Sequence, residues 1–348
     1  MKKIKILHVL NTNNFSGAEN LVCQIIEMYK NSEKFEMIYC SPDGQIRDSL
    51  KENNISFIPL RKLTRAGLKK VINYIKPDII HAHDIRASVL AAACKGKSIV
   101  VSHIHGNHED MRKLSLKSLL FRVASKRIRS IIWVSNSAYS SYRFKSEVSN
   151  KSKVISNVLD LQNLLKKAQE DPKTYDYEIV FLGRLSMAKN PIRLIEVMKL
   201  VLKKVPKAKV AIIGDGELRS KTFEHAEKSG LLESIDFLGF VNNPFKLLSD
   251  AKVMVMTSSH EGTPMCVLEA MALGVPLVST PTDGIRDVVL EGKTGFLSYE
   301  NKVLANNIVL LLNDEHRRSE MSKNCLKKAK HLNDLDKYRE EIEKVYYA

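Results

Sequence analysis

The sequence predicts an α/β protein built from two doubly wound units, each with a parallel sheet between layers of helices. Three observations lead to this fold class. The chain has 348 residues, which is long for one domain and comfortable for two. Short runs rich in β-branched residues alternate with amphipathic helical stretches. These runs are mostly apolar without polar alternation, as expected of parallel strands that are buried on both faces.

The expected strands fall into two series, one in each half of the chain. The first series comprises residues 5–10, 35–39, 79–81, 99–102 and 131–134. The second comprises residues 178–182, 209–213, 235–237, 253–256 and 277–279. Helical patterns lie between the strands, for example over residues 18–29, 191–203 and 266–273.

A polar segment between the two series marks the expected domain boundary. Residues 163–177 are polar and contain Asp171-Pro172, a dipeptide that favours a turn. We therefore expect a first domain over residues 1–162, a second over 163–331 and one more helix over 332–348. In open α/β sheets, ligands bind outside the carboxyl ends of the strands, so the residues that follow each strand are the candidates for function.

The composition excludes several classes of protein. Hydrophobic residues make up 44% and charged residues 27%, the profile of a soluble globular protein. The five cysteines form no C-x-x-C pair, which favours reduced, packed thiols in a cytosolic protein. The N-terminal segment begins with two lysines, but Lys5 and His8 interrupt its apolar part, so we interpret it as a strand rather than a signal peptide. No apolar run approaches the length of a membrane span.

Positive charge is concentrated in the first half of the chain. The net charge is +16, of which residues 1–160 carry +14. Residues 111–130 contain seven Lys or Arg and no acid. The apolar residues at helical spacing in this segment are Leu116, Leu119, Leu120 and Val123. Two interpretations remain open: a basic amphipathic helix on an anionic membrane, or a helix packed on its own sheet with a solvated basic face. A nucleic-acid partner is not expected, because the motifs of nucleic-acid-binding folds are absent from the sequence.

The strongest constellation of polar residues follows the expected strand at 253–256. A polar loop leads from this strand into a helix that begins near Met265, and Glu261 and Glu269 stand eight residues apart. Both carboxylates can face the same cleft, as can the N–H groups of residues 263–266, and such a helix start favours an anionic ligand. Glu269 lies in an otherwise apolar run, where a carboxylate needs a partner or a ligand. In the absence of a ligand, Glu261 would cap the helix and Glu269 would be solvated.

The segment from Glu261 to Pro276, with its E-x7-E spacing and the following Ala-Met-Ala-Leu-Gly-Val-Pro, resembles the family 4 retaining glycosyltransferases. The resemblance covers nearly the whole chain. Further matching segments are Gly17-Ala18-Glu19, 77–83, 180–185, Lys189-Asn190, 213–217, 237–239, Gly284 and 292–296. It implies the GT-B fold, with two Rossmann-like doubly wound domains facing each other across a cleft and a C-terminal helix that returns to the first domain.

The resemblance also implies how a donor would be held. Arg184 and Lys189 would bind the diphosphate of a nucleotide sugar, where two cations make charge-assisted hydrogen bonds and neutralise the leaving group. Glu269 would bind the ribose hydroxyls, and Glu261 would meet the hydroxyls of the transferred sugar. Because cationic side chains and the helix start act on the diphosphate, no metal or other cofactor is expected.

Two residues of the first domain take part in the implied site. Gly17 would begin a glycine loop that approaches the diphosphate, although Ser16 replaces the first of the two glycines usual in the family. His105 takes the position of a histidine near the reacting sugar. The implied catalytic residues are His105, Glu261, Arg184 and Lys189. The implied substrate-binding residues are Gly17, Arg184, Lys189, Glu261, Thr263, Pro264, Met265, Cys266 and Glu269.

The resemblance therefore implies a retaining hexosyl- or N-acetylhexosaminyltransferase. Its donor would be a nucleotide sugar, most simply a UDP-sugar, and its acceptor a saccharide or lipid-linked glycan in cell-surface polysaccharide biosynthesis. The front-face attack typical of the family would use the donor phosphate to take the acceptor's proton. We expect a cytoplasmic protein, peripheral on the inner face of the plasma membrane.

Other functions fit the sequence less well. A UDP-sugar 2-epimerase of similar fold would need no acceptor, and a non-catalytic binder of nucleotide sugars would never release the nucleotide from its sugar. The E-x7-E block disfavours the first, and the intact set of two cations and two glutamates disfavours the second. Zinc at His103, His105 and His108 would lack a cysteine or a cluster of carboxylates to complete a tetrahedral set. NAD is disfavoured because Arg219 replaces the third glycine of the dinucleotide fingerprint that begins at residue 214.

Overall fold

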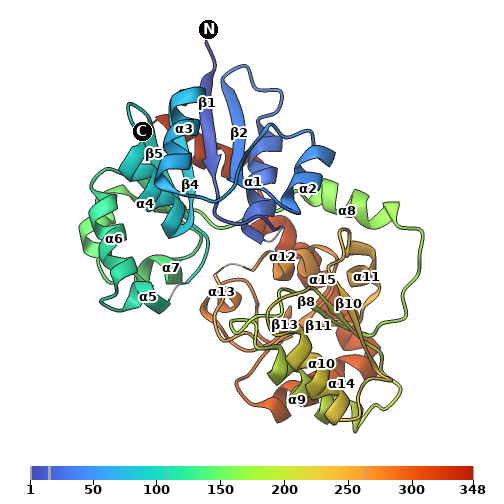
Figure 1. Ribbon diagram of the computed structural model, residues 1–348. Helices are drawn as coiled ribbons and strands as arrows, with labels where there is room; N and C mark the ends of the chain where they lie inside the picture. Colours follow the sequence, from blue (N-terminus) through green and yellow to red (C-terminus); the bar gives the residue numbers. More distant parts are fainter. Residues whose placement is uncertain (1, 15–16, 108, 263, 348) are drawn as a thin grey trace. The chain divides into compact units, whose positions relative to one another are not determined.

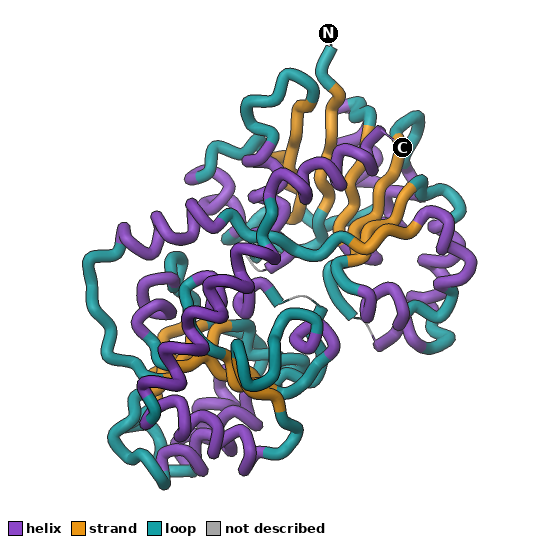
Figure 2. Tube along the Cα trace, turned by 180° about the vertical axis from the view of Figure 1, so that it is seen from behind, coloured by secondary structure: helices purple, strands orange, loops and turns teal. Residues whose placement is uncertain are grey.

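The computed structural model describes residues 2–14, 17–107, 109–262 and 264–347 (Figure 1). The chain divides into two compact units, one formed by Met1–Asn157 with Leu335–Ala348 and the other by Val158–Asp334. Each unit has its own sheet, with helices packed around it (Figure 2). The predicted α/β class with two Rossmann-like units is confirmed.

The sheet of the first unit has, in the described residues, seven parallel strands in the order β3-β2-β1-β4-β5-β6-β7. These strands are β1 (Ile4–Val9), β2 (Phe35–Pro42), β3 (Phe57–Leu60), β4 (Ile79–His83), β5 (Ile99–Ile104), β6 (Ser130–Trp133) and β7 (Ser152–Val154). The helices of this unit are α1 (Gly17–Met28), α2 (Ile46–Glu52), α3 (Arg65–Ile75), α4 (Asp84–Cys94), α5 (Glu109–Arg112), α6 (Leu116–Ser125), α7 (Asn136–Ser141), the 3-10 helix η1 (Lys145–Lys151) and α16 (Leu335–Tyr347). The strand order reverses between β1 and β4, which places the expected crevice beyond the carboxyl ends of these two strands.

The sheet of the second unit has six described strands, also parallel, in the order β10-β9-β8-β11-β12-β13. These strands are β8 (Ile179–Leu182), β9 (Val210–Ile213), β10 (Ile235–Gly239), β11 (Val253–Met256), β12 (Leu277–Ser279) and β13 (Gly295–Leu297). The helices are α8 (Leu161–Glu170), α9 (Pro191–Leu202), α10 (Arg219–Lys228), α11 (Phe245–Asp250), α12 (Met265–Ala272), α13 (Asp283–Arg286), α14 (Asn301–Asn313) and α15 (Glu315–Leu332). Here the order reverses between β8 and β11.

The central strands explain why the sequence shows apolar runs instead of alternation. All four residues of β9 and all four of β11 are buried, because helices cover both faces of the sheet. Burial of one such side chain contributes about 1.5–3 kcal/mol, so these strands anchor the core of the second unit.

The C-terminal helix α16 belongs to the first unit. Tyr29 Oη donates a hydrogen bond to the carbonyl oxygen of Arg339 at 3.0 Å, and Arg129 Nη2 donates to that of Tyr346 at 2.7 Å. The predicted return of the last helix to the first domain is therefore confirmed. The first change of unit falls at Asn157, before the boundary expected at 162, because Leu159 packs in the core of the second unit.

Candidate functional site

Two loops meet at the carboxyl edge of the second sheet, where the strand order reverses. One follows β8 and the other follows β11. The backbone N–H of Ser259 donates to the carbonyl oxygen of Ala188 at 2.8 Å, and Thr257 Oγ1 donates to that of Asn190 at 3.0 Å. Asn190 has a left-handed backbone with φ of 49° and caps α9 with its side chain. These bonds hold the two predicted motifs, Lys189-Asn190 and the E-x7-E segment, against each other.

A buried ion pair joins the two loops. Lys189 Nζ lies 2.6 Å from Glu261 Oε1, and the two side chains are only 18% and 9% exposed. Ser258 Oγ donates a further hydrogen bond to the same carboxylate oxygen at 2.5 Å. Burial disfavours the charged form of Lys189, but its acidic neighbours, with Glu261 acting most strongly, together outweigh this effect and raise the lysine pKa. The site therefore holds a lysine cation close to a carboxylate that can accept hydrogen bonds from sugar hydroxyls.

Glu269, the second glutamate of the E-x7-E spacing, lies inside α12 and is buried. Burial raises its pKa to about 7, although Lys189 and Lys167 act in the opposite direction. The group is therefore close to the change between its neutral and ionised forms at physiological pH. In the ionised form, a carboxylate can accept hydrogen bonds from two neighbouring hydroxyls.

Arg184 stands at the exposed end of the same loop. Its side chain is 65% exposed, and Nη2 lies 3.3 Å from Glu217 Oε2, which is also largely exposed. Such surface pairs contribute little to stability, so an anionic ligand can displace Glu217 at small cost. The aliphatic part of Lys189 passes over Gly183, the residue before Arg184. Both cations that the resemblance assigns to a diphosphate thus come from one short loop.

Two glycines of this unit, Gly214 and Gly284, allow backbone segments to pack closely. A Cβ at Gly214 would lie 2.1 Å from the carbonyl oxygen of Gly183, so the Gly-Asp-Gly sequence allows two loops to touch. A Cβ at Gly284 would lie 1.0 Å from the carbonyl oxygen of Gly262. The absence of a side chain at Gly284 therefore lets the loop that carries Glu261 rest on α13.

The start of α12 supplies backbone donors. Pro264 is the N-cap, and Met265 and Cys266 open the helix. The first N–H groups of any helix have no partner within it and favour an anion. Burial raises the pKa of the Cys266 thiol to about 12, so this thiol stays neutral. Thr263, which the sequence also assigned to the site, lies outside the described residues, as do Ser16 and His108.

The first unit has a pocket of about 180 Å³ at the carboxyl ends of β1 and β4. It is lined by Leu10, Asn11, Thr12, Ala18, Glu19, His83, Asp84, Ile85, Arg86 and Lys117. Gly17 is exposed and begins α1, the helix that supplies Ala18 and Glu19. Glu19 is buried and accepts a hydrogen bond from Thr12 Oγ1 at 2.5 Å. The pocket therefore lies where the reversal of strand order predicts a crevice.

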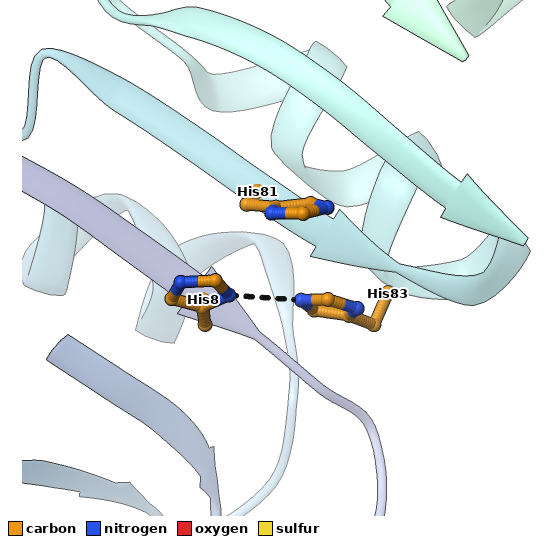
Figure 3. Close-up of side chains that lie close together, drawn as sticks. All are labelled: His8, His81 and His83. Atoms are coloured by element: carbon orange, nitrogen blue, oxygen red, sulfur yellow. Dashed lines mark hydrogen bonds between the residues drawn. The ribbon is translucent and has the colours of Figure 1, made fainter. Parts of the chain in front are cut away.

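A cluster of histidines, which sequence reasoning missed, borders this pocket. The rings come from β1, β4 and β5 and the residue after β5, and they belong to His8, His81, His83, His103 and His105. Figure 3 shows His8 and His83 edge to edge, with the ring of His81 beside them. His8 is the register partner of His81, and His83 that of His103. The available signal was a histidine near the carboxyl end of three expected strands, those at 5–10, 79–81 and 99–102.

His105, the implied catalytic residue, is partly buried and follows β5. Its backbone N–H donates to Asp84 Oδ1 at 3.1 Å, and its ring Nε2 lies 2.8 Å from His83 Nδ1. Asp84 opens α4 with a left-handed backbone, φ 65°. The loop after β5 is thus attached to the end of β4 through backbone and side chain.

The helix α6 presents an apolar face to solvent. The exposed fractions of its outer residues are 75% for Leu116, 38% for Leu119, 47% for Leu120 and 65% for Val123. The residues through which the helix packs on its unit are Phe121 and Ala124, which are buried. The four apolar residues at helical spacing therefore do not form the packed face of α6, although the helix does pack on its own unit and its basic residues Arg122 and Lys126 are exposed.

Cations of this segment pair with acidic neighbours outside it. Lys113 pairs with Glu109, Lys117 with Asp110 and Arg122 with Glu147. The local positive charge is thus smaller than the segment alone suggests. None of the helices in the described ranges combines the length and apolar character needed to cross a bilayer.

Two family models match the chain in adjacent segments. The model described as glycosyltransferase family 4 matches residues 16–163, and the model described as glycosyl transferases group 1 matches residues 163–330. Together they cover most of both structural units. The second match contains both loops of the carboxyl edge described above.

Individual relatives and a solved structure agree with these matches. A UDP-Gal:alpha-D-GlcNAc-diphosphoundecaprenol alpha-1,3-galactosyltransferase of Escherichia coli is 27% identical, over 99% of this chain and 97% of the relative. An uncharacterized glycosyltransferase of Methanocaldococcus jannaschii is 29% identical, over 82% of this chain and 84% of the relative. The crystal structure of Anabaena HepE with UDP-glucose is similar in fold, with a TM-score of 0.83 and 21% identity over 99% of both chains.

Proposed function

Because this chain belongs to the family 4 glycosyltransferases, of GT-B fold, we propose that it transfers a hexose or N-acetylhexosamine with retention from a UDP-sugar to a lipid-linked saccharide. The observation that carries the proposal is the carboxyl edge of the second sheet. There a partly buried lysine, an exposed arginine, two glutamates and a helix start gather at the point of strand reversal. The proposed acceptor follows the E. coli galactosyltransferase, whose name specifies a UDP-sugar donor and a diphosphoundecaprenol-linked acceptor.

In the proposed mechanism, the second unit binds the donor. Arg184 and Lys189 hydrogen-bond the diphosphate and stabilise the negative charge that develops as the bond between sugar and phosphate breaks. The N–H groups at the start of α12 also stabilise this negative charge. The acceptor hydroxyl forms the new bond from the face that the phosphate leaves, and the departing phosphate takes the hydroxyl proton. The configuration at the sugar carbon is thereby kept.

The carboxylates and the histidine have separate tasks in this proposal. Glu261, already an acceptor for Lys189 and Ser258, orients hydroxyls of the transferred sugar. Ionised Glu269 accepts hydrogen bonds from the ribose hydroxyls. His105 hydrogen-bonds an oxygen at the reacting centre. We further propose that no metal or other cofactor takes part, since the cations act directly on the leaving group.

The direct test incubates the protein with UDP-sugars and undecaprenyl-diphosphate-linked saccharides, in the presence of EDTA, and measures UDP release. We expect release that depends on acceptor, and a product whose anomeric configuration by NMR equals that of the donor. Conversion of the donor without acceptor would indicate an epimerase. Binding without release would indicate a carrier protein, and an absolute need for added manganese would overturn the metal-free mechanism.

We also propose that the first unit binds anionic membranes reversibly, which would place the enzyme on the cytoplasmic face where lipid-linked acceptors are presented. The supporting observation is the exposed apolar face of α6, formed by Leu116, Leu119, Leu120 and Val123. Exposed cations adjoin it, including Lys126 and Arg127. An amphipathic helix of this kind binds through buried apolar area together with attraction to anionic lipid, about 1 kcal/mol for each Lys or Arg near the surface.

Co-sedimentation with phosphatidylglycerol-containing vesicles tests the membrane proposal. The double variant Leu116→Ser/Val123→Ser should lose binding at all salt concentrations, while Lys126→Gln/Arg127→Gln should weaken it mainly at low salt. Val303→Ser is a matched control, because Val303 is exposed on α14 of the second unit. Equal binding of the first double variant and wild type would rule out α6 as the contact.

A further inference from the structure

Among the described residues other than glycine, four have a left-handed backbone. Two of them follow or end helices: Asn54 comes after α2 with φ 54°, and Lys76 ends α3 with φ 50°. This conformation is ordinary at a helix end, where it helps to satisfy the last carbonyl groups. The other two begin helices: Asp84 opens α4 with φ 65°, and Asn190 caps the start of α9 with φ 49°. A helix normally starts from extended backbone, so these two positions need an explanation.

Both unusual helix starts lie at a strand reversal. Asp84 follows β4 and Asn190 lies in the loop after β8, and these are strands at which the order of their sheets reverses. Asn190 is next to Lys189 in the sequence, and Asp84 lines the pocket of the first unit. Backbone in a sparsely populated conformation tends to occur at functional sites, and it persists only where its surroundings determine it. The surroundings of Asp84 therefore indicate what holds it in this form.

The carboxylate of Asp84 continues the sheet at the point where the backbone leaves it. The ladder between β4 and β5 starts with the N–H of Ile99, which donates to the carbonyl oxygen of Asp78. Every second residue donates in a parallel ladder, so the N–H of His105 would meet the carbonyl oxygen of Asp84. It instead donates to Asp84 Oδ1 at 3.1 Å. A side-chain oxygen thus replaces the carbonyl oxygen of the same residue and attaches the loop after β5 to α4.

The carbonyl group of Asp84 has another partner. It accepts a hydrogen bond from Ser88 Oγ at 2.7 Å, one turn further along α4. Ser88 Oγ also lies 2.7 Å from Ser102 Oγ of β5, and both serines are fully buried. Because the hydroxyl hydrogen of Ser88 is used at Asp84, Ser102 is the donor in the second bond. Asp84 is therefore connected to β5 and its loop by two routes, one through the carboxylate and one through the carbonyl.

Aspartate meets both demands of this position. Asp and Asn adopt the left-handed conformation more readily than most residues with a side chain. Asp84 also supplies the oxygen that accepts from the N–H of His105. Glycine would suit the backbone but lacks the oxygen, whereas alanine lacks the oxygen and is disfavoured in this conformation as well. Asparagine would retain both the oxygen and the backbone, so these three residues separate the two demands.

The turn at Asp84 forms one wall of the pocket in the first unit. Four consecutive residues line the pocket there: His83, Asp84, Ile85 and Arg86. A change in the backbone of Asp84 would therefore move this wall. The pocket belongs to the first unit, whereas the proposed donor-binding residues belong to the second.

We propose that Asp84 is a positioning residue that shapes the pocket of the first unit for the acceptor. Its left-handed backbone and its bond to the N–H of His105 hold the start of α4 and the loop after β5 in one arrangement. The inference rests on the proposed function only for the use of this pocket by an acceptor. The arrangement itself is a property of the folded protein and can be measured without substrate.

The test without substrate is hydrogen exchange at the backbone amide of His105, followed by NMR. Asp84→Asn should keep this amide protected, and Asp84→Gly should speed its exchange about 10-fold or more, because a buried hydrogen bond is lost. Lys76→Gly is the matched control: it places glycine at an exposed left-handed position of the same unit and should leave exchange at His105 unchanged. Wild-type exchange in Asp84→Gly, or equally fast exchange in Asp84→Asn, would overturn the proposal.

The second readout is the KM for the acceptor at a saturating concentration of donor. Asp84→Asn should stay within about 3-fold of wild type, and Asp84→Gly should raise this KM about 10-fold. Asp84→Ala should raise it about 5-fold further, because alanine is penalised in the left-handed conformation. The donor KM should be unchanged in all three variants, and Lys76→Gly should match wild type in both constants.

The outcomes separate this inference from the proposed function. As large a rise of acceptor KM in Asp84→Asn as in Asp84→Gly would assign the effect to the charge of the carboxylate and overturn the positioning role. Equal values in the glycine and alanine variants would overturn the part assigned to the backbone. A wild type that uses no acceptor, but whose His105 amide exchanges in the expected order among the variants, would refute only the proposed function.

Discussion

The carboxyl edges of the two sheets share the same kind of strand reversal but carry different side chains. In the second unit, the edge at the strand reversal holds the Lys189–Glu261 ion pair, Arg184 and the buried Glu269. In the first unit, the corresponding edge holds hydrogen-bonded histidines beside a pocket whose lining also includes Glu19, Asp84, Arg86 and Lys117. The second edge is marked by a close lysine–glutamate pair, and the first by a cluster of imidazole rings.

This difference shows that a doubly wound fold determines where chemistry can occur but not which chemistry it is. A charged edge suits a diphosphate, whose charge increases as the donor bond breaks. The histidine-rich edge suits an acceptor hydroxyl, because imidazole nitrogens can donate or accept the hydrogen bonds that orient it. The predictions below test this division, from the largest expected effect to the smallest.

Replacing Lys189 should have the largest effect. Lys189→Ala removes a cation from the leaving group, so kcat should fall about 100- to 1000-fold, the usual loss for one donor to a developing anion. Lys199→Ala is the matched control, because Lys199 is exposed on α9 of the same unit. Steady-state kinetics with a saturating donor measures both. A near-normal kcat in Lys189→Ala would break the assignment of the charged edge to catalysis.

A backbone substitution should disturb the same edge indirectly. Gly284→Ala would force a Cβ into the carbonyl group of Gly262, so we expect a loss of about 3 kcal/mol or more in the free energy of unfolding. Gly67→Ala is the comparison in the first unit, where the nearest atom to the new Cβ is the side-chain oxygen of Thr64 at 3.2 Å. Urea unfolding of both variants measures the difference. Equal stability would show that the Glu261 loop does not depend on contact with α13.

The smallest of the three effects concerns pH. The pKa of Glu269 is about 7 in the folded protein, against 4.5 for an ordinary glutamate. Between pH 4.5 and 7, the folded state therefore keeps a proton on Glu269 that the unfolded state has released. The contribution of this proton to stability is complete below pH 4.5 and is lost as pH rises to about 7, by at most about 3 kcal/mol. Glu269→Gln should remove this dependence. Parallel stability profiles for wild type and variant between these pH values would contradict a buried, proton-binding Glu269.

Much of the fold follows from local patterns in the sequence. The central strands are apolar throughout, and their alternation with helices predicts parallel sheets. The strands β3, β7 and β13 have no such signal, because they are edge strands of three or four residues. In addition, β3 contains Pro59, a residue that argues against a strand in a sequence pattern.

The site was predictable in its members but not in its contacts. The spacing of Glu261 and Glu269 pointed to both glutamates, whereas the two cations of the loop after β8 were assigned only through the resemblance to the family. The direct pairing of Lys189 with Glu261 depends on two loops far apart in sequence being joined at Ser259 and Ala188. The cluster of histidines was missed for a similar reason, since the register of three strands brings the rings of His8, His81, His83 and His103 together.

The most direct test of the division between the edges is the affinity for UDP, measured by calorimetry in the presence of EDTA. The account predicts that wild type binds UDP, that Lys189→Ala and Arg184→Ala each weaken binding at least about 10-fold, and that His105→Ala binds UDP as wild type does while turning over more slowly. Lys199→Ala should behave as wild type in both respects. If UDP affinity were unaffected by either cation variant, or were lost only in His105→Ala, the charged edge of the second unit would not be the donor site.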